Sequence, residues 1–234
     1  SDVIAIQGAT VANATLVGNM SASNANIQIS DNTMGLGQDD VVVIADCQNA
    51  DMFRITNAAN GGGNVTLTHA NSTNTTNRLS APYNTDAQIM FFESVAYYIA
   101  ATGRQSEHGE PINALYRFTD NMSDTVAPTF IAEELIEGVD SMQILYGERL
   151  ATGNLRYVTA DNVANMQLVE SIQLGLLLSG SRSILQADDE SSYTLPGELI
   201  VSEGTVGADV THTVDRRLRR DYSLTINLRN RRTQ

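Results

Sequence analysis

The chain has no lysine and no tryptophan, and only one of its 234 residues is a cysteine. A single cysteine excludes a disulfide within the chain and a zinc cluster built from cysteines. We expect Cys47 to be largely buried, because it follows the apolar run Val41 to Ile44. No stretch approaches the roughly 18 uninterrupted apolar residues of a membrane-spanning helix, so the sequence as given is predicted to be soluble.

Catalytic and metal-binding patterns are also scarce. His69, His108 and His212 lie in polar surroundings without a second histidine at metal-ligand spacing, so we expect all three on the surface. The sequence contains no GxSxG, HExxH or P-loop motif. The acidic run Asp188 to Glu190 is typical of a solvated face. We therefore predict no catalytic residue, no cofactor and no enzymatic function.

One loop offers oxygen ligands for a metal ion. Between Asp120 and Asp124, two aspartates, an asparagine and a serine lie close together and could bind calcium. The ligand order and the glycine of an EF-hand are missing, however. A polar loop is therefore favoured over a metal site.

The positive charge is concentrated at one end of an acidic chain. The sequence has 14 Lys+Arg against 27 Asp+Glu, and its formal net charge is -13. This balance makes nonspecific binding of nucleic acid or anionic lipid by the body of the chain unexpected. Arginines cluster between Arg216 and Arg232, however, and could bind DNA if they converged on one exposed face. Arg216, Arg217, Arg219 and Arg220 are therefore candidate interaction residues.

The same stretch has the pattern of a folded strand. Tyr222, Leu224, Ile226 and Leu228 alternate with polar residues, which is typical of a strand with one buried and one wet face. We therefore interpret it as the last strand of the fold and not as a disordered arm. Asp215 is predicted to open a short helix or turn, which would spread the arginines and pair some of them with carboxylates of the body.

Strand patterns dominate the rest of the chain. The densest run of aromatic and β-branched residues is 89–100, and it is expected to form a hairpin with a return strand around Leu115 and Tyr116. A second hairpin is predicted between 154–160 and 170–180, with one helical turn in the connection. Further strands are expected around residues 4–6, 26–30, 41–44, 52–55, 65–69, 141–147, 195–204 and 222–228.

Helix is expected in one place above all. Pro128 is a typical helix start, Ile131, Leu135 and Ile136 have helical spacing, and Gly138 is a typical end. The sequence as a whole predicts an α+β fold that is mainly antiparallel β, with one or two short helices. Residues 1–234 are expected to form a single domain.

Several segments, taken in order, resemble the PilW family of minor pilins of the type IV pilus. They are "VVVIADCQNADMFRIT", "VAYYIA" followed by "GEPINALYRF", "ELIEGVDSMQILYG", "YVTADNV" leading to "VESIQLGLLLSGS", and "DRRLRRDYSLTINLRNR". Together these blocks cover the chain from Val41 to Arg232. The resembled family ends in a strand closed by a Leu-Arg-Asn-Arg motif, which is matched at Leu228 to Arg231.

The resemblance implies a pilin-like or pseudopilin-like head without catalytic activity. Such a subunit joins other minor pilins, and a tip adhesin, in a complex that primes pilus assembly and supports adhesion, twitching or DNA uptake. The resemblance also implies a leader and a long hydrophobic helix, which anchors the subunit in the inner membrane and later contacts the major pilin. We expect this sequence to be the head domain alone, first in the periplasm and then in the cell-surface pilus.

Three alternatives stay open at this point. PilW is similar to the J-type minor pseudopilin of type II secretion, which is the nearest other family. A DNA-binding tip module would use the C-terminal arginines. An enzyme such as a periplasmic hydrolase would need a pocket that joins a histidine to a carboxylate and a hydroxyl group.

Overall fold

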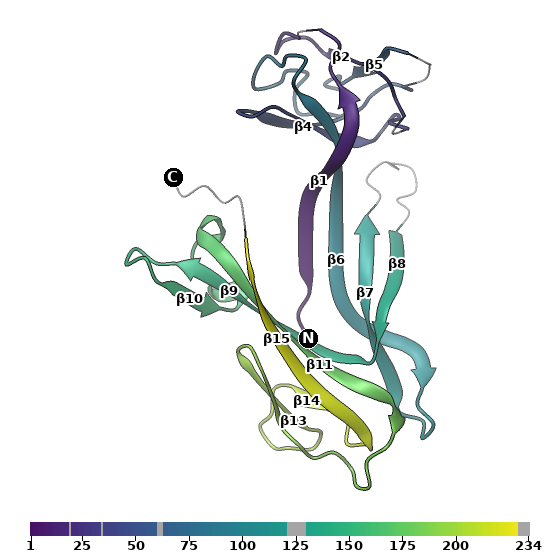
Figure 1. Cartoon of the computed structure of the whole chain (residues 1–234), viewed down its shortest axis with the longest axis vertical. Coiled ribbons are helices and arrows are strands. Elements are labelled where there is room, and N and C mark those ends of the chain that lie inside the picture. Colours follow the sequence, from purple (N-terminus) through teal and green to yellow (C-terminus); the bar gives the residue numbers. More distant parts are fainter. Residues whose placement is uncertain (19, 34, 60–62, 121–129, 229–234) are drawn as a thin grey trace. The chain divides into compact units, whose positions relative to one another are not determined.

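The computed structural model describes residues 1–18, 20–33, 35–59, 63–120 and 130–228, and their regular secondary structure is almost entirely β-strand (Figure 1). The only helical segments in that part of the chain are two short 3-10 turns, η1 (Ala160–Asn162) and η2 (Met166–Leu168). The strands are β1 (Ile4–Thr15), β2 (Asn26–Ile29), β3 (Val41–Ala45), β4 (Ala50–Arg54), β5 (Val65–Thr68), β6 (Gln88–Gln105), β7 (Pro111–Asp120), β8 (Phe130–Glu137), β9 (Val139–Arg149), β10 (Leu155–Val158), β11 (Val169–Ser183), β12 (Tyr193–Leu195), β13 (Glu198–Ser202), β14 (Thr211–His212) and β15 (Arg217–Asn227). The expected mainly antiparallel β-fold is confirmed.

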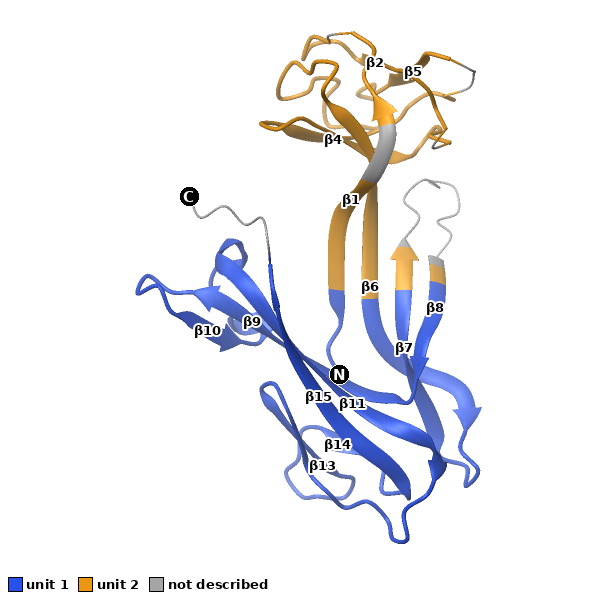
Figure 2. Ribbon diagram, in the orientation of Figure 1, with its two compact units in different colours: residues 1–4, 97–117, 132–234 blue, residues 5–96, 118–131 orange. Residues whose placement is uncertain are grey.

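The chain divides into two compact units (Figure 2). Unit 1 consists of Ser1–Ile4, Tyr97–Arg117 and Ala132–Gln234. Unit 2 consists of Ala5–Ala96 and Phe118–Ile131.

Unit 2 is built around an apolar core that short strands supply. β3 pairs antiparallel with β4 on one side and with β6 on the other, and β2 pairs with β5 in a separate two-stranded sheet. The alternation in β2 and β5 places Ile27, Ile29, Val65 and Leu67 inward, as the period of a strand requires. Tyr83 lies fully buried in the same core. These strands match the predictions made from their alternating patterns.

Unit 1 contains a four-stranded antiparallel sheet in the order β10-β9-β11-β15. A small three-stranded sheet, β12-β13-β14, supplies the residues that cover one of its faces. On that face Leu177 of β11 packs with Leu195 and Ile200 in a buried cluster. Gly175 allows the close approach, because a Cβ atom added there would lie 2.3 Å from Pro196 Cδ. One face of the four-stranded sheet therefore packs against the three-stranded sheet of unit 1.

The helix predicted from Pro128 to Gly138 is wrong. Residues 130–137 form strand β8, which lies beside β7 in the strand order, while Pro128 falls outside the described residues. Ile131, Leu135 and Ile136 are all exposed, so their spacing does not mark a buried helix face. The described residues therefore lack the α-helical part of the predicted α+β class.

The first predicted hairpin is confirmed, and the second is wrong. β6 and β7 are neighbours, and β6 continues to Gln105, five residues beyond the predicted run 89–100. β10 pairs with β9 and not with β11, with Val158 opposite Tyr146. A tight turn explains this pairing, since Gly153 has a φ of 87° and its N–H donates to the Leu150 carbonyl at 2.8 Å. The helical turn expected before β11 is present as η1 and η2.

Candidate interaction surfaces

The last strand, β15, is folded as predicted, but its two sides are the reverse of the expectation. Arg217 and Arg219 are buried, with 1% and 3% of their surfaces exposed. Tyr222, Leu224 and Ile226 are exposed at 53%, 47% and 44%. The prediction of a half-buried apolar face is therefore wrong, since the buried positions of β15 carry cations and its apolar positions face outward.

Arg219 is surrounded by three carboxylates, those of Asp140, Asp189 and Asp215. We call these three aspartates, Arg219 and Arg217 the arginine network. Arg219 Nε donates to Asp140 Oδ2 at 3.0 Å, its Nη1 donates to Asp189 Oδ2 at 3.3 Å, and its Nη2 donates to Asp215 Oδ2 at 2.9 Å. Arg217 Nε donates to the same Asp215 oxygen at 2.7 Å. Burial by itself raises the pKa of Asp215, but hydrogen bonds from Arg219 and Arg217 outweigh it and hold that pKa below its usual value. All five charges are thus paired inside unit 1.

The four candidate arginines are therefore not brought together on one surface. Of the predicted short helix or turn, the helix is wrong, because residues 217–220 lie in β15. Asp215 instead opens a bend at residues 215–216, where its Oδ1 accepts a hydrogen bond from the Arg217 N–H at 2.9 Å.

The expected pairing with carboxylates of the body is confirmed for Arg219, which pairs with Asp140, and for Arg216, which pairs with the exposed Asp188 at 3.3 Å. Arg217 pairs with the neighbouring Asp215. Arg220 is exposed. Within the described part of the chain, a DNA-binding face can draw only on Arg216 and Arg220 from this group, and the role of the four in contacts stays a prediction.

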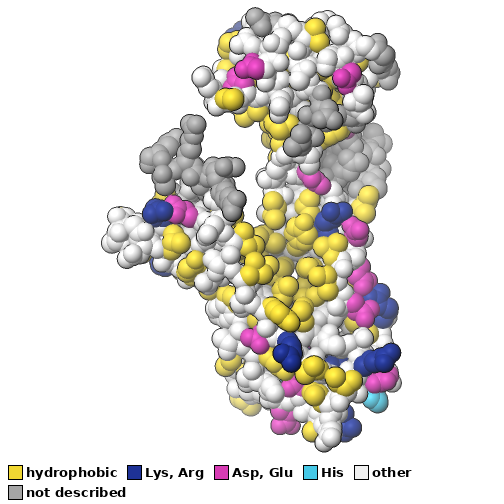
Figure 3. Space-filling model, viewed as in Figure 1, with side chains coloured by type: hydrophobic (Ala, Val, Ile, Leu, Met, Phe, Trp, Pro, Cys, Tyr) yellow, Lys and Arg dark blue, Asp and Glu magenta, His cyan; other side chains and the backbone are white. Residues whose placement is uncertain are grey.

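The sheet face that β12-β13-β14 leave uncovered is apolar, and we call it the apolar face. Residues opposite each other in neighbouring strands share one face of a sheet. Across β11 and β15 the apolar pairs are Ile172–Ile226, Leu174–Leu224 and Leu176–Tyr222, and β9 continues the rows with Tyr146, Ile144 and Met142. Figure 3 shows hydrophobic side chains gathered over β11 and β15 in this view. The β15 end of the apolar face is open to solvent.

A shallow open groove lies at one end of the apolar face. It has a volume of about 450 Å³, and Leu178, Leu218, Ile184 and Tyr222 contribute its apolar lining. Arg182 and Arg220 also line it, and both are exposed. The groove therefore combines an apolar floor with two cations at its margin.

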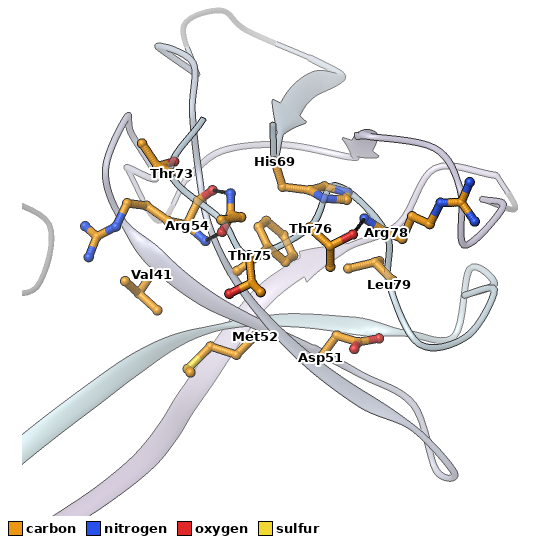
Figure 4. A pocket seen from close by; sticks show the side chains of 12 residues that line it. Val41, Asp51, Met52, Arg54, His69, Thr73, Thr75, Thr76, Arg78 and Leu79 are labelled. Atoms are coloured by element: carbon orange, nitrogen blue, oxygen red, sulfur yellow. Dashed lines mark hydrogen bonds between the residues drawn. The ribbon is translucent and has the colours of Figure 1, made fainter. Parts of the chain in front are cut away.

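Unit 2 has a cavity of its own, drawn in Figure 4. Its volume is about 350 Å³, and three threonines, Asn74 and His69 are among the residues that line it. Figure 4 shows Arg54 and Arg78 extending away from the other lining side chains in opposite directions. The ring of His69 lies 4.9 Å from that of Phe53. Its Nε2 is buried and has no hydrogen-bond partner in the described part of the chain.

The histidine predictions are right for one residue and wrong for two. His108 is exposed, whereas His69 and His212 are buried. His212 bridges two backbone carbonyls, with Nε2 at 2.8 Å from Ser191 O and Nδ1 at 3.0 Å from Thr213 O. The acidic run Asp188 to Glu190 also differs from its prediction, because Asp189 is buried in the arginine network. Short polar sequence around a residue does not reveal whether a distant strand covers it.

Among the described residues, no group of three or more histidine, cysteine, aspartate or glutamate side chains could hold a metal ion. The carboxylates of Asp140, Asp189 and Asp215 converge, but on the guanidinium of Arg219. The side chains of Asp120 to Asp124, for which calcium was considered, lie outside the described part.

His69 predicts a pH dependence for unit 2. Burial lowers the pKa of His69 more than hydrogen bonding to the backbone of Asn24 raises it. Below the ordinary pKa of about 6.5 the unfolded chain takes up a proton that the folded chain does not, so stability falls as the pH falls. We expect urea unfolding to show this loss between pH 7.5 and 5.5, with a slope of at most about 1.4 kcal/mol per pH unit.

Two variants isolate the contribution of this imidazole. The pH-dependent loss should be reduced in His69→Phe, which keeps a ring against Phe53, and retained in His108→Gln, in which an exposed histidine is replaced. An equal pH slope in His69→Phe and the unchanged protein would show that the buried imidazole is not its source.

Cys47 is exposed, so the prediction of a buried thiol is wrong. The residue follows β3 in the turn to β4, where Asp46 Oδ1 accepts hydrogen bonds from the backbone N–H groups of Gln48 and Asn49. We expect a thiol reagent to label Cys47 in the native protein nearly as fast as in urea. Protection of the native thiol by more than about tenfold would contradict this placement.

The described residues therefore form a β-rich protein with an apolar row exposed on β15. The model of the family described as PilW, Type IV Pilus-assembly protein W, matches residues 96–230, which is more than half of the chain. The chain belongs to this family, and its function lies in assembly of the type IV pilus. No curated protein and no solved structure matches the chain. The helical segments of the described residues are too short to span a membrane.

Proposed function

We propose that this chain is the head of a minor pilin that joins other minor pilins, together with a tip adhesin, in a complex at the pilus tip. The complex primes assembly and supports adhesion, twitching or DNA uptake. Membership of the PilW family supports the assembly role, and the resemblance of the chain to minor pilins supports the finer assignment. The function is structural and involves no catalytic step.

The apolar face is the observation that carries this proposal. Tyr222, Leu224 and Ile226 expose about half of their surfaces in a row on one strand. A row of this kind is costly for an isolated protein in water and is typical of a surface that another segment covers. A head domain that packs into a fibre needs such surfaces, whereas an enzyme needs converging reactive groups.

The hydrophobic helix that the resemblance implies is the natural cover for the part of the apolar face on β11, where Ile172, Leu174 and Leu176 are half-buried. On β9, Met142 and Ile144 are already buried within the chain. An apolar helix packed on a half-exposed sheet face buries both surfaces at once. In this proposal residues 1–234 form one head domain, located in the periplasm before assembly and in the pilus afterwards. Similarity to the J-type minor pseudopilin stays a prediction.

The proposal is tested by changing the apolar face in the bacterium that encodes the protein. Ile226→Asp should leave the head folded, because the side chain is exposed, but it should strongly reduce surface pili by placing a charge on a contact surface. Pili are counted by electron microscopy in a strain that carries the variant as its only copy. Thr225→Asp, on the opposite face of the same strand, is the matched control and should assemble pili. Normal piliation in a strain that lacks the gene altogether would overturn the proposed function.

A further inference from the structure

The second half of β15 is covered on neither face. β15 occupies the end of the strand order and pairs only with β11 within the described residues (Figure 1). All eight residues from Arg220 to Asn227 are exposed, those on the apolar face and those on the opposite side alike. An edge strand that is exposed on both faces gains little from burial, and natural proteins usually protect such strands.

The backbone of this edge has a defined set of outward groups. Leu228 N–H donates to Glu170 O at 2.8 Å, and the register places Ser171 opposite Asn227. In an antiparallel pair the residues alternate between bonding to the partner and pointing away from it. The even-numbered residues of β15 therefore bond to β11. The N–H and C=O groups of Ser223 and Thr225 point to the open side.

The edge also lacks the devices that prevent strand pairing. The register between β11 and β15 is unbroken from Arg219 to Asn227, so no bulge interrupts the open side. Residues 220–227 contain no proline and no lysine, and their only charges are Arg220 and Asp221. A long, regular edge without such devices is a template for another strand.

Charge identifies the kind of strand that fits. Most arginines in the described part of the chain are paired with carboxylates, including Arg216, Arg217 and Arg219 of the same region. Within the described residues neither Arg220 nor its neighbour Arg182 has a carboxylate partner. A carboxylate on an added strand, directly opposite Arg220, would pair with its guanidinium on the apolar face.

We propose that β15 is a strand-addition site, which binds an extended segment of another pilus protein antiparallel to residues 220–227. The segment alternates apolar and polar residues, with its apolar side chains beside Tyr222, Leu224 and Ile226 and an acidic residue opposite Arg220. The identity of the donor as a pilus protein rests on the proposed function. Backbone bonding supplies affinity, and the alternating side chains with the acidic residue supply register.

A proline on the open side tests the backbone part of the inference. Thr225→Pro removes an outward N–H without removing a bond to β11, so the head should stay folded and strand addition should be blocked. Thr225→Val keeps the N–H and is the matched control. With soluble heads of the minor pilins encoded beside this protein, calorimetry should show binding that weakens about tenfold or more in the proline variant alone. Retained protection of the Leu224 amide from hydrogen exchange verifies that the proline variant is folded.

Amide hydrogen exchange measures the same interaction at individual residues of β15. The amides of Ser223 and Thr225 should exchange quickly in the free protein and become protected in the complex, while those of Tyr222 and Leu224 stay protected in both. Binding without new protection at Ser223 and Thr225, and without an effect of Thr225→Pro, would overturn strand addition and leave the proposed function standing.

A designed peptide tests the open edge of β15 without the partner proteins. The amidated peptide TVTITVTE places its glutamate opposite Arg220 when it adds antiparallel, and TVTITVTK is its charge-reversed control. The acidic peptide should protect Ser223 and Thr225 and bind at least about threefold more tightly than the control, with the difference lost in Arg220→Gln. If the partner heads do not bind at all, the proposed function fails while peptide binding still supports the site. The inference is overturned if neither the partner heads nor the peptides protect the amides of Ser223 and Thr225. It is also overturned if their protection depends only on the concentration of this protein, since that would indicate pairing of β15 with a second copy.

Discussion

Replacing Arg219 by methionine should lower the free energy of unfolding of unit 1 by about 3–5 kcal/mol. The variant leaves the buried Asp189 and Asp215 and the partly buried Asp140 around a missing cation, and each would lose a hydrogen bond from the guanidinium. Buried carboxylates without a counter-charge are strongly destabilising, and this cost exceeds the value of the methionine contacts. Urea unfolding followed by circular dichroism measures the change.

The control uses an arginine only three residues away. Arg216 makes an exposed pair with Asp188, and Arg216→Met should change the stability little. Equal effects of the two substitutions would show that the arginine network does not hold the start of β15 in place.

The arginine network should also determine how the stability of unit 1 falls at acidic pH. Burial raises the pKa of Asp215 and of Asp189, but hydrogen bonds outweigh it and hold both below their usual values. The main donor is Arg219 for Asp215 and the Tyr193 hydroxyl for Asp189, with Arg219 a smaller contributor there. Their stabilisation is therefore complete above the unfolded pKa of about 4 and is lost as the pH falls through the folded values. The unchanged protein should lose stability steeply below pH about 4, and the Arg219→Met variant less steeply.

Replacing Gly138 by alanine should destabilise unit 1 by about 3 kcal/mol or more. Gly138 is the single residue between β8 and β9, and its φ of 77° is in the left-handed region. An added Cβ would lie 2.2 Å from the backbone oxygen of Ser179. The residue cannot move away easily, because its N–H donates to Asn113 O at 2.8 Å and its carbonyl accepts from Ser179 N–H at 2.7 Å.

Gly153→Ala separates backbone strain from steric collision. Gly153 also has a positive φ, of 87°, but no atom lies within 4 Å of an added Cβ. The alanine there should cost only about 1–2 kcal/mol, the value of left-handed strain. A Gly138→Ala variant that is no less stable than Gly153→Ala would contradict the close packing at Ser179. Thermal unfolding monitored by circular dichroism is sufficient for this comparison.

Local sequence predicted the strands of this protein well, because alternation reports the local period of the backbone. Alternation indicates β5, β11 and β15, whereas a continuous apolar run indicates β3 and a high density of aromatic and β-branched residues indicates β6. Alternation does not report which side a distant segment covers. Asp140 and Asp189, which are distant from β15 in sequence, join the neighbouring Asp215 around the arginines on one side of the strand. Arg217 and Arg219 are therefore buried, while Ile226 is exposed.

The candidate surfaces were only partly predictable for the same reason. The pairing of terminal arginines with carboxylates followed from the charge balance, since the chain has an excess of acidic residues. The position of Cys47 in a turn and the burial of His69 depend on how strands of unit 2 assemble. The strand β8 was mistaken for a helix because Ile131 and Leu135 have helical spacing, although neither is in the core. The cavity of unit 2 has no signal in the local sequence.

The central claim is that this head assembles with other minor pilins. It is tested most directly by mixing the purified chain with soluble heads of the minor pilins encoded beside it, and by following complex formation by size-exclusion chromatography with light scattering. We expect a complex that contains this chain, of weak to moderate affinity, because in the fibre several contacts act together. Absence of any complex at concentrations up to about 100 μM, with each head folded and with all heads combined, would contradict the account.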